Sequence, residues 1–207
     1  MKRTFHNLPA ERQAEIKHIC LQEFVEYGYD NASINRIVKK LGIAKGSFYN
    51  YISTKEDLYI ELFEEMYREA QDLFERSAPY KTNDLFDRID GLMSFSIAIC
   101  RNNPLQYKLL LQSELDTASS MYTRIHKLRG ELFQKSYATL FDNVGWSQYR
   151  FPREDILAIF SWLSAGIRED LRTRIDTGVD LEEFEEVIRH RLSLYKESLT
   201  RGIYKDL

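Results

Sequence analysis

The chain has 207 residues, 43% of them hydrophobic, which is enough for a sizeable core in one large domain or two small ones. Only 9 Gly and 4 Pro occur and strand-type alternation is hard to find, so the composition favours an all-helical fold. No apolar run approaches the roughly 18 residues of a membrane span, and the N-terminus lacks the apolar core of a signal peptide. We therefore expect a cytoplasmic protein with no membrane partner.

Charge is distributed unevenly, although the net charge of −3 would by itself argue against a nucleic-acid partner. Residues 1–58 hold nine Lys or Arg against seven Asp or Glu, a net charge of +2, which leaves −5 for the remainder. Residues 31–55 hold five Lys or Arg and no acidic residue. A modular DNA-binding protein needs only its footprint to be basic, so the N-terminal part is the candidate footprint.

The first expected helix opens near residues 7–11, where Pro9 suits a first turn and Glu11 suits the helix dipole. Its inner stripe recurs at helical spacing, at Ile16, Ile19, Cys20 and Phe24. Gly28 is expected to end this helix, and Tyr29 to pack back into the core. The helix supports the two that follow, because a helix pair alone buries too little apolar surface.

The stretch 33–55 predicts a helix, a tight turn and a second short helix. Ser33 is a natural N-cap, since its hydroxyl can accept from an unpaired backbone N–H. An apolar face follows at Ile34, Ile37, Val38 and Leu41. Gly42 can end the helix because Gly enters the left-handed region at little cost. Residues 44–51 suffice for about two more turns, and a Ser-x-x-Glu capping box at residues 53–56 opens the next helix.

A helix-turn-helix whose surface carries one sign of charge suits duplex DNA. The alternative is a solvated basic face on an ordinary helical hairpin, and charge alone does not separate the two. If Phe48 and Ile52 point inward, the polar residues of the short helix point outward, namely Lys45, Ser47 and Asn50. Such side chains can bond to base edges or to phosphate. Tyr49 and Tyr51 are either core aromatics or residues whose hydroxyls reach phosphate oxygens.

These motifs resemble the DNA-binding domain of TetR-family transcriptional regulators. The resemblance rests on Phe24-x-x-x-Gly28-Tyr29, on Ser33-Ile34-x-x-Ile37, and on the run from Leu41 to Leu58 with its aromatic cluster and lysine. It extends over about a quarter of the chain, and the fixed spacing of its glycines, turn, aromatics and lysine makes it specific.

The resemblance implies a role in DNA binding for several residues of this stretch. The residues expected to hold the DNA backbone are Ser33, Tyr49, Tyr51 and Lys55. Those expected to lie against bases are Asn35, Lys45, Gly46, Ser47 and Asn50. Many family members have His where this chain has Tyr51. The chain therefore departs from the family pattern at this position. Tyr is bulkier than His and neutral, so the departure affects the expected phosphate contact.

Residues 58–207 are expected to form a helical domain that follows a DNA-binding domain of residues 1–57. A long helix is predicted from Leu58 to about Ser77, and residues 77–82 form the clearest break in the chain. Further helices are expected to begin near residues 83, 104, 119, 152 and 180. The fold class is therefore all-α, with a three-helix DNA-binding domain and a helical effector-binding and dimerisation domain.

The resemblance further implies that a small molecule binds within the second domain. The sequence itself shows an aromatic-rich bundle in which some rings could line an apolar cavity, with plain core packing as the alternative. The candidate lining residues are Phe63, Tyr67, Phe86, Phe95, Tyr107, Phe133, Tyr137 and Trp162. No cluster of charge indicates the chemical class of this effector.

The last two helices carry apolar stripes that predict an assembly surface, although the same stripes could close the core of a monomer. Two-fold dimers are the commonest oligomers, and helix-turn-helix proteins bind two half-sites. TetR-like proteins pair through their last two long helices, so the resemblance implies a homodimer. The residues expected at its interface are Ile159, Leu163, Gly166, Ile167, Phe184, Ile188, Leu192 and Tyr195.

Enzyme motifs are missing from the sequence. The four histidines are scattered, and no nucleophile elbow or phosphate-binding loop occurs. We therefore expect no enzyme, cofactor or metal, and two buried thiols at Cys20 and Cys100. The expected function is a ligand-responsive repressor on a pseudo-palindromic operator in double-stranded DNA. The alternatives are a helical protein-interaction scaffold and a transcriptional activator of the same fold.

Overall fold

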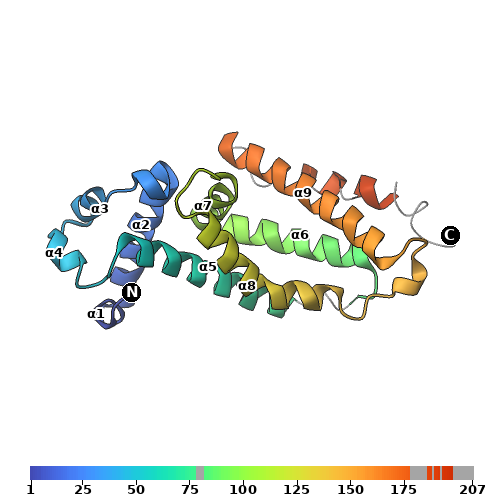
Figure 1. Ribbon diagram of the computed structural model, residues 1–207, viewed down its shortest axis with the longest axis horizontal. Helices are drawn as coiled ribbons and strands as arrows, with labels where there is room; N and C mark the ends of the chain where they lie inside the picture. Colours follow the sequence, from blue (N-terminus) through green and yellow to red (C-terminus); the bar gives the residue numbers. More distant parts are fainter. Residues whose placement is uncertain (78–81, 178–185, 188, 192, 198–207) are drawn as a thin grey trace. The chain divides into compact units, whose positions relative to one another are not determined.

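The computed structural model describes residues 1–77, 82–177, 186–187, 189–191 and 193–197. Within these ranges no strand occurs, which confirms the all-helical expectation (Figure 1). The helices are α1 (Arg3–His6), α2 (Ala10–Asn31), α3 (Ile34–Leu41), α4 (Lys45–Phe48), α5 (Lys55–Ser77), α6 (Leu85–Asn102), α7 (Pro104–Leu115), α8 (Tyr122–Phe141), the 3-10 helix η2 (Trp146–Gln148) and α9 (Arg153–Thr177). Each helix within the described ranges is too short or too polar to cross a bilayer.

The chain forms two compact units. Unit 1 comprises Met1–Leu73 and Asn102–Lys135, and unit 2 comprises Phe74–Arg101 and Ser136–Leu207. Unit 1 therefore joins α1–α4 to the first part of α5, to α7 and to the first part of α8. The predicted boundary between residues 57 and 58 separates two functions, DNA binding and effector binding, rather than two compact units. That boundary stays a prediction.

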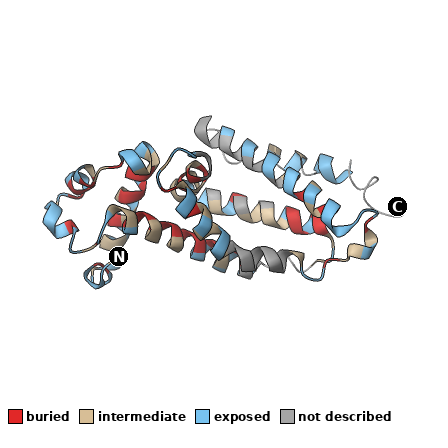
Figure 2. Ribbon diagram, in the orientation of Figure 1, coloured by how far each residue is buried: buried red, intermediate tan, exposed pale blue. Residues whose placement is uncertain are grey.

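The core of unit 1 is built from apolar side chains of nearly all its helices, as the red segments of α2, α3 and α5 in Figure 2 show. Its most buried members, none more than 2% exposed, are Phe5, Ile16, Cys20, Phe24, Ile37, Phe48, Ile52, Leu58, Leu62, Phe63 and Leu109. Burial raises the pKa of the Cys20 thiol to about 12, and the nearby Glu23 carboxylate adds to that effect. Cys20 is therefore a buried, unreactive thiol, as expected from its position on the apolar stripe.

Unit 2 has its own core, in which Arg88 and Tyr149 are buried. Both side chains form hydrogen bonds to the backbone. The backbone N–H of Leu85 donates to the Tyr149 hydroxyl at 2.8 Å, and the Arg88 guanidinium donates to the carbonyls of Thr82 and Asp142. Burial lowers the pKa of Arg88 below its usual range. These bonds tie the start of α6 to the segment between α8 and α9.

Several local predictions are confirmed and others are wrong by a residue or a turn. α2 breaks at Gly28 (φ 69°, ψ 170°), a backbone conformation nearly confined to glycine, but one further turn continues to Asn31. The capping box lies one residue later than predicted: Thr54, not Ser53, accepts the N–H of Asp57 at 3.0 Å. Two adjacent hydroxyl residues precede α5, and sequence alone does not separate them.

The turn between α3 and α4 is a Schellman motif centred on Gly42, which has φ +66°. The N–H of Ile43 donates to the Val38 carbonyl at 3.1 Å, and that of Gly42 donates to the Lys39 carbonyl at 3.3 Å. Two otherwise unpaired helix carbonyls are thereby satisfied. The helix therefore ends where the sequence predicts it, at a left-handed glycine.

Replacing Gly42 with valine is expected to destabilise the protein by about 1–3 kcal/mol, because a β-branched residue resists the left-handed conformation. Space is not the cause, since no atom lies within 4 Å of a Cβ built at Gly42. Gly46 is equally open but lacks a positive φ, so Gly46→Val is the matched control. The measurement is the urea-unfolding free energy of both variants. Equal losses would show that the turn conformation is not the cause.

Candidate nucleic-acid interface

The exposed face of α4 is polar and basic, and its opposite face is buried. Phe48 is 0% exposed and Ile52 is 1% exposed, so both point into the core of unit 1. The residues expected to lie against bases are all exposed, namely Asn35, Lys45, Gly46, Ser47 and Asn50. Helix α4 itself covers only Lys45–Phe48, and turns rather than the predicted second helical turn continue to residue 51. The outward placement therefore matches the sequence expectation, whereas the helix is shorter.

The two tyrosines of the cluster differ in their environments. Tyr49 is 37% exposed, whereas Tyr51 is half-buried and packs against the core of unit 1. For each tyrosine, packing of the ring against the core does not prevent the hydroxyl from reaching a phosphate. Their assignment to DNA phosphates stays a prediction.

Ser33 occupies the predicted N-cap of α3, but its hydroxyl does not cap the helix. Its backbone N–H instead donates to Oε1 of Glu23, at 2.9 Å. Glu23 lies on α2 and is 0% exposed. The capping prediction is therefore wrong in its chemistry, because a buried carboxylate from the preceding helix holds the start of α3.

The same carboxylate oxygen also binds Arg36. Both the Nε and the Nη2 of Arg36 lie 2.7 Å from Oε1 of Glu23, and Nη2 also donates to the Asn31 carbonyl at 2.7 Å. The hydrogen bond that Arg36 donates to the Glu23 carboxylate raises the pKa of Arg36, and the guanidinium lies 3.9 Å from the centroid of the Tyr27 ring. Arg36 therefore fixes α3 against α2, and its charge is largely committed inside the protein.

Lys55 is also used within the protein. Its ammonium donates to the carbonyls of Tyr29 at 2.8 Å and Ala32 at 3.2 Å, and lies 4.4 Å from the centroid of the Tyr29 ring. These carbonyls belong to the end of α2, where a cation offsets the negative end of the helix dipole. The structure thus gives Lys55 a stabilising role that the sequence reasoning missed, beside its predicted phosphate contact.

Two lysines of the basic stretch remain exposed and uncommitted. In the described part of the chain no carboxylate pairs with Lys39 or Lys45, whereas Lys40 lies 3.8 Å from Glu26. Sequence reasoning missed Lys39 as a candidate contact. It follows the exposed Asn35 by four residues, and that spacing places two residues on the same face of a helix.

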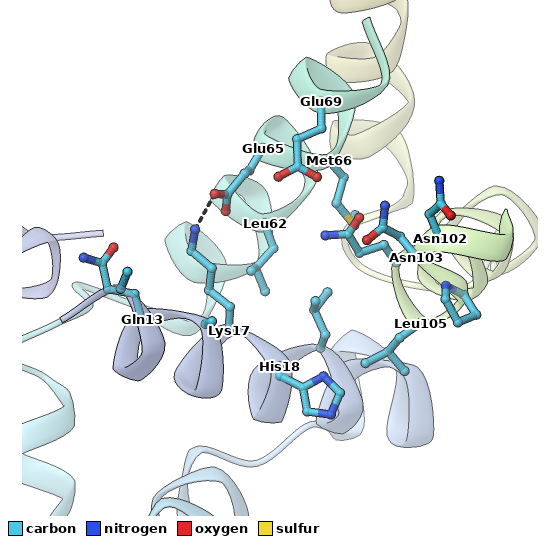
Figure 3. A pocket seen from close by; sticks show the side chains of 15 residues that line it. Gln13, Lys17, His18, Leu62, Glu65, Met66, Glu69, Asn102, Asn103 and Leu105 are labelled. Atoms are coloured by element: carbon cyan, nitrogen blue, oxygen red, sulfur yellow. Dashed lines mark hydrogen bonds and ion pairs between the residues drawn. The ribbon is translucent and has the colours of Figure 1, made fainter. Parts of the chain in front are cut away.

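A cavity of about 630 Å³ lies within unit 1, between α2, α5 and the start of α7 (Figure 3). Its lining includes the apolar side chains of Leu21, Leu62, Met66 and Leu105. Lys17 and Glu65 also line it and form an ion pair with each other. Partial burial raises the pKa of Glu69, and the neighbouring Glu65 carboxylate adds to this. The cavity has the size of small-molecule sites and mixed chemistry.

None of the residues predicted to line a ligand pocket lines this cavity. Phe63 and Tyr67 are buried in the core of unit 1, and Tyr107 is a half-buried residue of the same unit. Phe86 is buried in unit 2, and Phe95 packs on Phe74. Trp162 is 75% exposed and lies on the surface of α9 rather than around a cavity. The side chains of Phe133 and Tyr137 lie outside the described residues. The predicted set is therefore not brought together in this cavity.

The predicted interface residues that can be placed lie on α9 and on the helical stretch after it. Ile159 and Leu163 are half-buried, Gly166 is exposed, and Tyr195 is 38% exposed. The side chain of Ile167, and Phe184, Ile188 and Leu192, lie outside the described residues. Trp162, on the same helix as Ile159 and Leu163, is an exposed large apolar side chain of α9.

Among the described residues, no three His, Cys, Asp or Glu side chains gather into a group that could hold a metal ion. The fold and the site together define an all-helical protein with a rigidly held helix-turn-helix and an exposed basic face. Residues 21–62 match the family model described as "Bacterial regulatory proteins, tetR family". The helix-turn-helix region of this chain is therefore that of the TetR family of transcriptional regulators.

Known proteins agree with this assignment. The HTH-type transcriptional repressor AcnR of Corynebacterium jeikeium is 31% identical over 64 residues, which cover 31% of this chain and 34% of that protein. The chain spans only 34–40% of the length of the first curated relatives it matches. A TetR family regulator from Chloroflexus aurantiacus has the same fold over 99% of both chains, with a TM-score of 0.74 and 22% identity. A regulator from Saccharomonospora viridis, solved in complex with choline, covers 96% of this chain and 100% of its own, with a TM-score of 0.60 and 19% identity.

Proposed function

We propose that this protein binds a specific DNA sequence through α4 and thereby represses transcription. We further propose that it is cytoplasmic and has neither enzymatic activity nor a cofactor. The observation that carries the proposal is the orientation of α4 and the turn after it, which exposes Lys45, Ser47 and Asn50 while Phe48 anchors the helix in the core. These side chains can reach base edges in the major groove, and the uncommitted Lys39 can neutralise a nearby phosphate.

Binding to DNA is tested by measuring affinity against salt for the full chain. A dimer that neutralises several phosphates per subunit is expected to lose affinity steeply, with a log–log slope of about −0.9 for each phosphate. It should also prefer one site selected from genomic fragments over random DNA. Weak binding with a shallow slope and no preferred site would instead support a protein-interaction scaffold.

We propose that the protein acts as a homodimer on a pseudo-palindromic operator. The exposed Trp162 on α9, with Leu163 and Tyr195 as candidate neighbours, supports a self-complementary apolar contact. Two-fold pairing presents two reading helices to two half-sites. Sedimentation equilibrium with the full chain is expected to give a dimer at micromolar concentration, and a monomer there would contradict the proposal.

We propose that a small molecule regulates DNA binding. The cavity of about 630 Å³ supports this, because it is bounded by α2 and α5, the helices that flank the helix-turn-helix in the chain. A ligand that favours the non-binding state by about 2.7 kcal/mol weakens operator affinity roughly a hundredfold. The choline complex of the Saccharomonospora regulator supports ligand binding on this fold. Screening compounds for release of bound DNA tests the idea, and reporter transcription distinguishes repressor from activator.

A further inference from the structure

The N-terminal segment of unit 1 binds the backbone that follows α4. The backbone N–H of Lys2 donates to the Tyr51 carbonyl at 2.8 Å, and its ammonium donates to the Tyr49 carbonyl at 2.7 Å. The Thr4 hydroxyl donates to the carbonyl between them, that of Asn50. Three consecutive carbonyls therefore each accept a hydrogen bond from residues 2–4.

These carbonyls have a physical need for partners. Tyr49 is the C-cap of the four-residue helix α4, and residues 50 and 51 form the turn after it, so these carbonyls have no partner inside the helix. So short a helix is unstable by itself, and its position depends on tertiary contacts. An ammonium at its C-terminal end also meets the negative end of the helix dipole. Lys2 supplies both a donor and a charge of the favourable sign.

Residues 2–4 are themselves held in place by the neighbouring Phe5, so they can restrain the backbone after α4. Phe5, in α1, is 0% exposed and belongs to the core of unit 1. Its ring contacts His6 edge-on, with centroids 5.5 Å apart. The backbone at residues 49–51 is thus tied through three hydrogen bonds to a segment anchored by a buried aromatic side chain.

We propose that Lys2 and Thr4 are positioning residues for DNA recognition. They fix the backbone that carries Tyr49 and Asn50, and so hold Asn50 where it can contact a base edge and Tyr49 where it can contact a phosphate. The inference rests on the proposed function, since it concerns the same reading surface. A bidentate contact from an amide to a base tolerates little displacement, so a looser backbone costs sequence discrimination rather than overall affinity.

The neighbouring Arg3 provides a matched control. It is exposed, and in the described part of the chain its side chain makes no hydrogen bond or ion pair. Lys2→Ala and Arg3→Ala each remove one positive charge, one residue apart, so they should weaken binding to any DNA to a similar degree. Only Lys2→Ala also removes a donor to the Tyr49 carbonyl.

The experiment compares affinity for the selected site with affinity for random DNA at one salt concentration. Lys2→Ala is expected to reduce this ratio roughly tenfold, whereas Arg3→Ala leaves it unchanged. Thr4→Val, which keeps the shape but removes the hydroxyl, should also reduce the ratio, and Lys2→Arg should restore it. Melting temperatures serve to exclude general unfolding, and amide hydrogen exchange at residues 48–52 should rise in Lys2→Ala but not in Arg3→Ala.

Suppose that wild type prefers the selected site over random DNA. Equal ratios of these two affinities for Lys2→Ala and Arg3→Ala would then overturn this proposal and leave the proposed function intact. A wild type that shows no preferred site would overturn both. The hydrogen-exchange measurement separates the two ideas further, because it needs no DNA: unchanged exchange in Lys2→Ala would show that Lys2 does not hold the backbone.

Discussion

Lys45→Ala is expected to change which base pairs the protein prefers, and to lower its affinity for the selected site about 5- to 150-fold. Lys45 is exposed at the start of α4, and in the described residues no carboxylate competes for its ammonium. Loss of one well-placed contact to a base edge costs about 1–3 kcal/mol, which corresponds to that range of affinity. Affinity for random DNA should fall far less, by the contribution of one charge.

Lys39→Ala is the control for this change. Lys39 is also an exposed lysine without a carboxylate partner in the described chain, but it lies in the last turn of α3 rather than on α4. We expect it to weaken binding to all sequences alike and to leave the preferred site unchanged. The measurement is selection of sites from a random DNA library with wild type and both variants. The same selected site for Lys45→Ala as for wild type would show that Lys45 does not read bases.

The local structure of the reading region could be predicted because each step of it depends on near neighbours in sequence. The left-handed turn needed a glycine, and Gly42 follows directly on an apolar helical stripe. The outward direction of Lys45 and Asn50 followed from the spacing of Phe48 and Ile52, both of which are buried. Periodicity and turn chemistry act over a few residues, so sequence patterns report them well.

The contacts that hold this region in place could not be predicted in the same way. Helix α1 has four residues and a single buried side chain, Phe5, so it leaves no periodic signal. The sequence predicts Lys55 to be a basic surface residue, yet its ammonium donates hydrogen bonds to carbonyls 23–26 residues earlier in the chain. The cavity beside α2 likewise depends on packing between segments that are distant in sequence. Such long-range partners follow from the fold and not from local composition.

Glu23 is an intermediate case, because it leaves a signal that a closer reading could use. It follows Cys20 by three residues and Ile16 by seven, and so lies on the inward stripe of α2. An acidic residue at such a position needs a buried partner, since an unpaired buried charge is costly. Arg36 is the partner in the structure, and the pair aligns α2 with α3.

Arg36→Gln is expected to destabilise the protein by about 3–5 kcal/mol, because it leaves the Glu23 carboxylate buried without its charged partner. Glu23 is 0% exposed, and its Oε2 has no hydrogen-bond partner even in the intact protein. The nearest other cation among the described residues is the Lys40 ammonium, 4.0 Å from that oxygen. An ammonium at that distance on a side chain that is 41% exposed offsets little of the loss.

A double-mutant cycle identifies the cause of this destabilisation. Glu23→Gln combined with Arg36→Gln removes both charges, so it should be clearly more stable than Arg36→Gln alone. Lys40→Gln is the control for loss of an exposed charge near the same carboxylate, and it should cost less than about 1 kcal/mol. Urea unfolding of wild type, Glu23→Gln, Arg36→Gln, the double variant and Lys40→Gln measures these free energies. If the double variant were no more stable than Arg36→Gln, the loss would come from the packing of Arg36 on Tyr27, 3.9 Å from the ring centroid, and not from the stranded carboxylate.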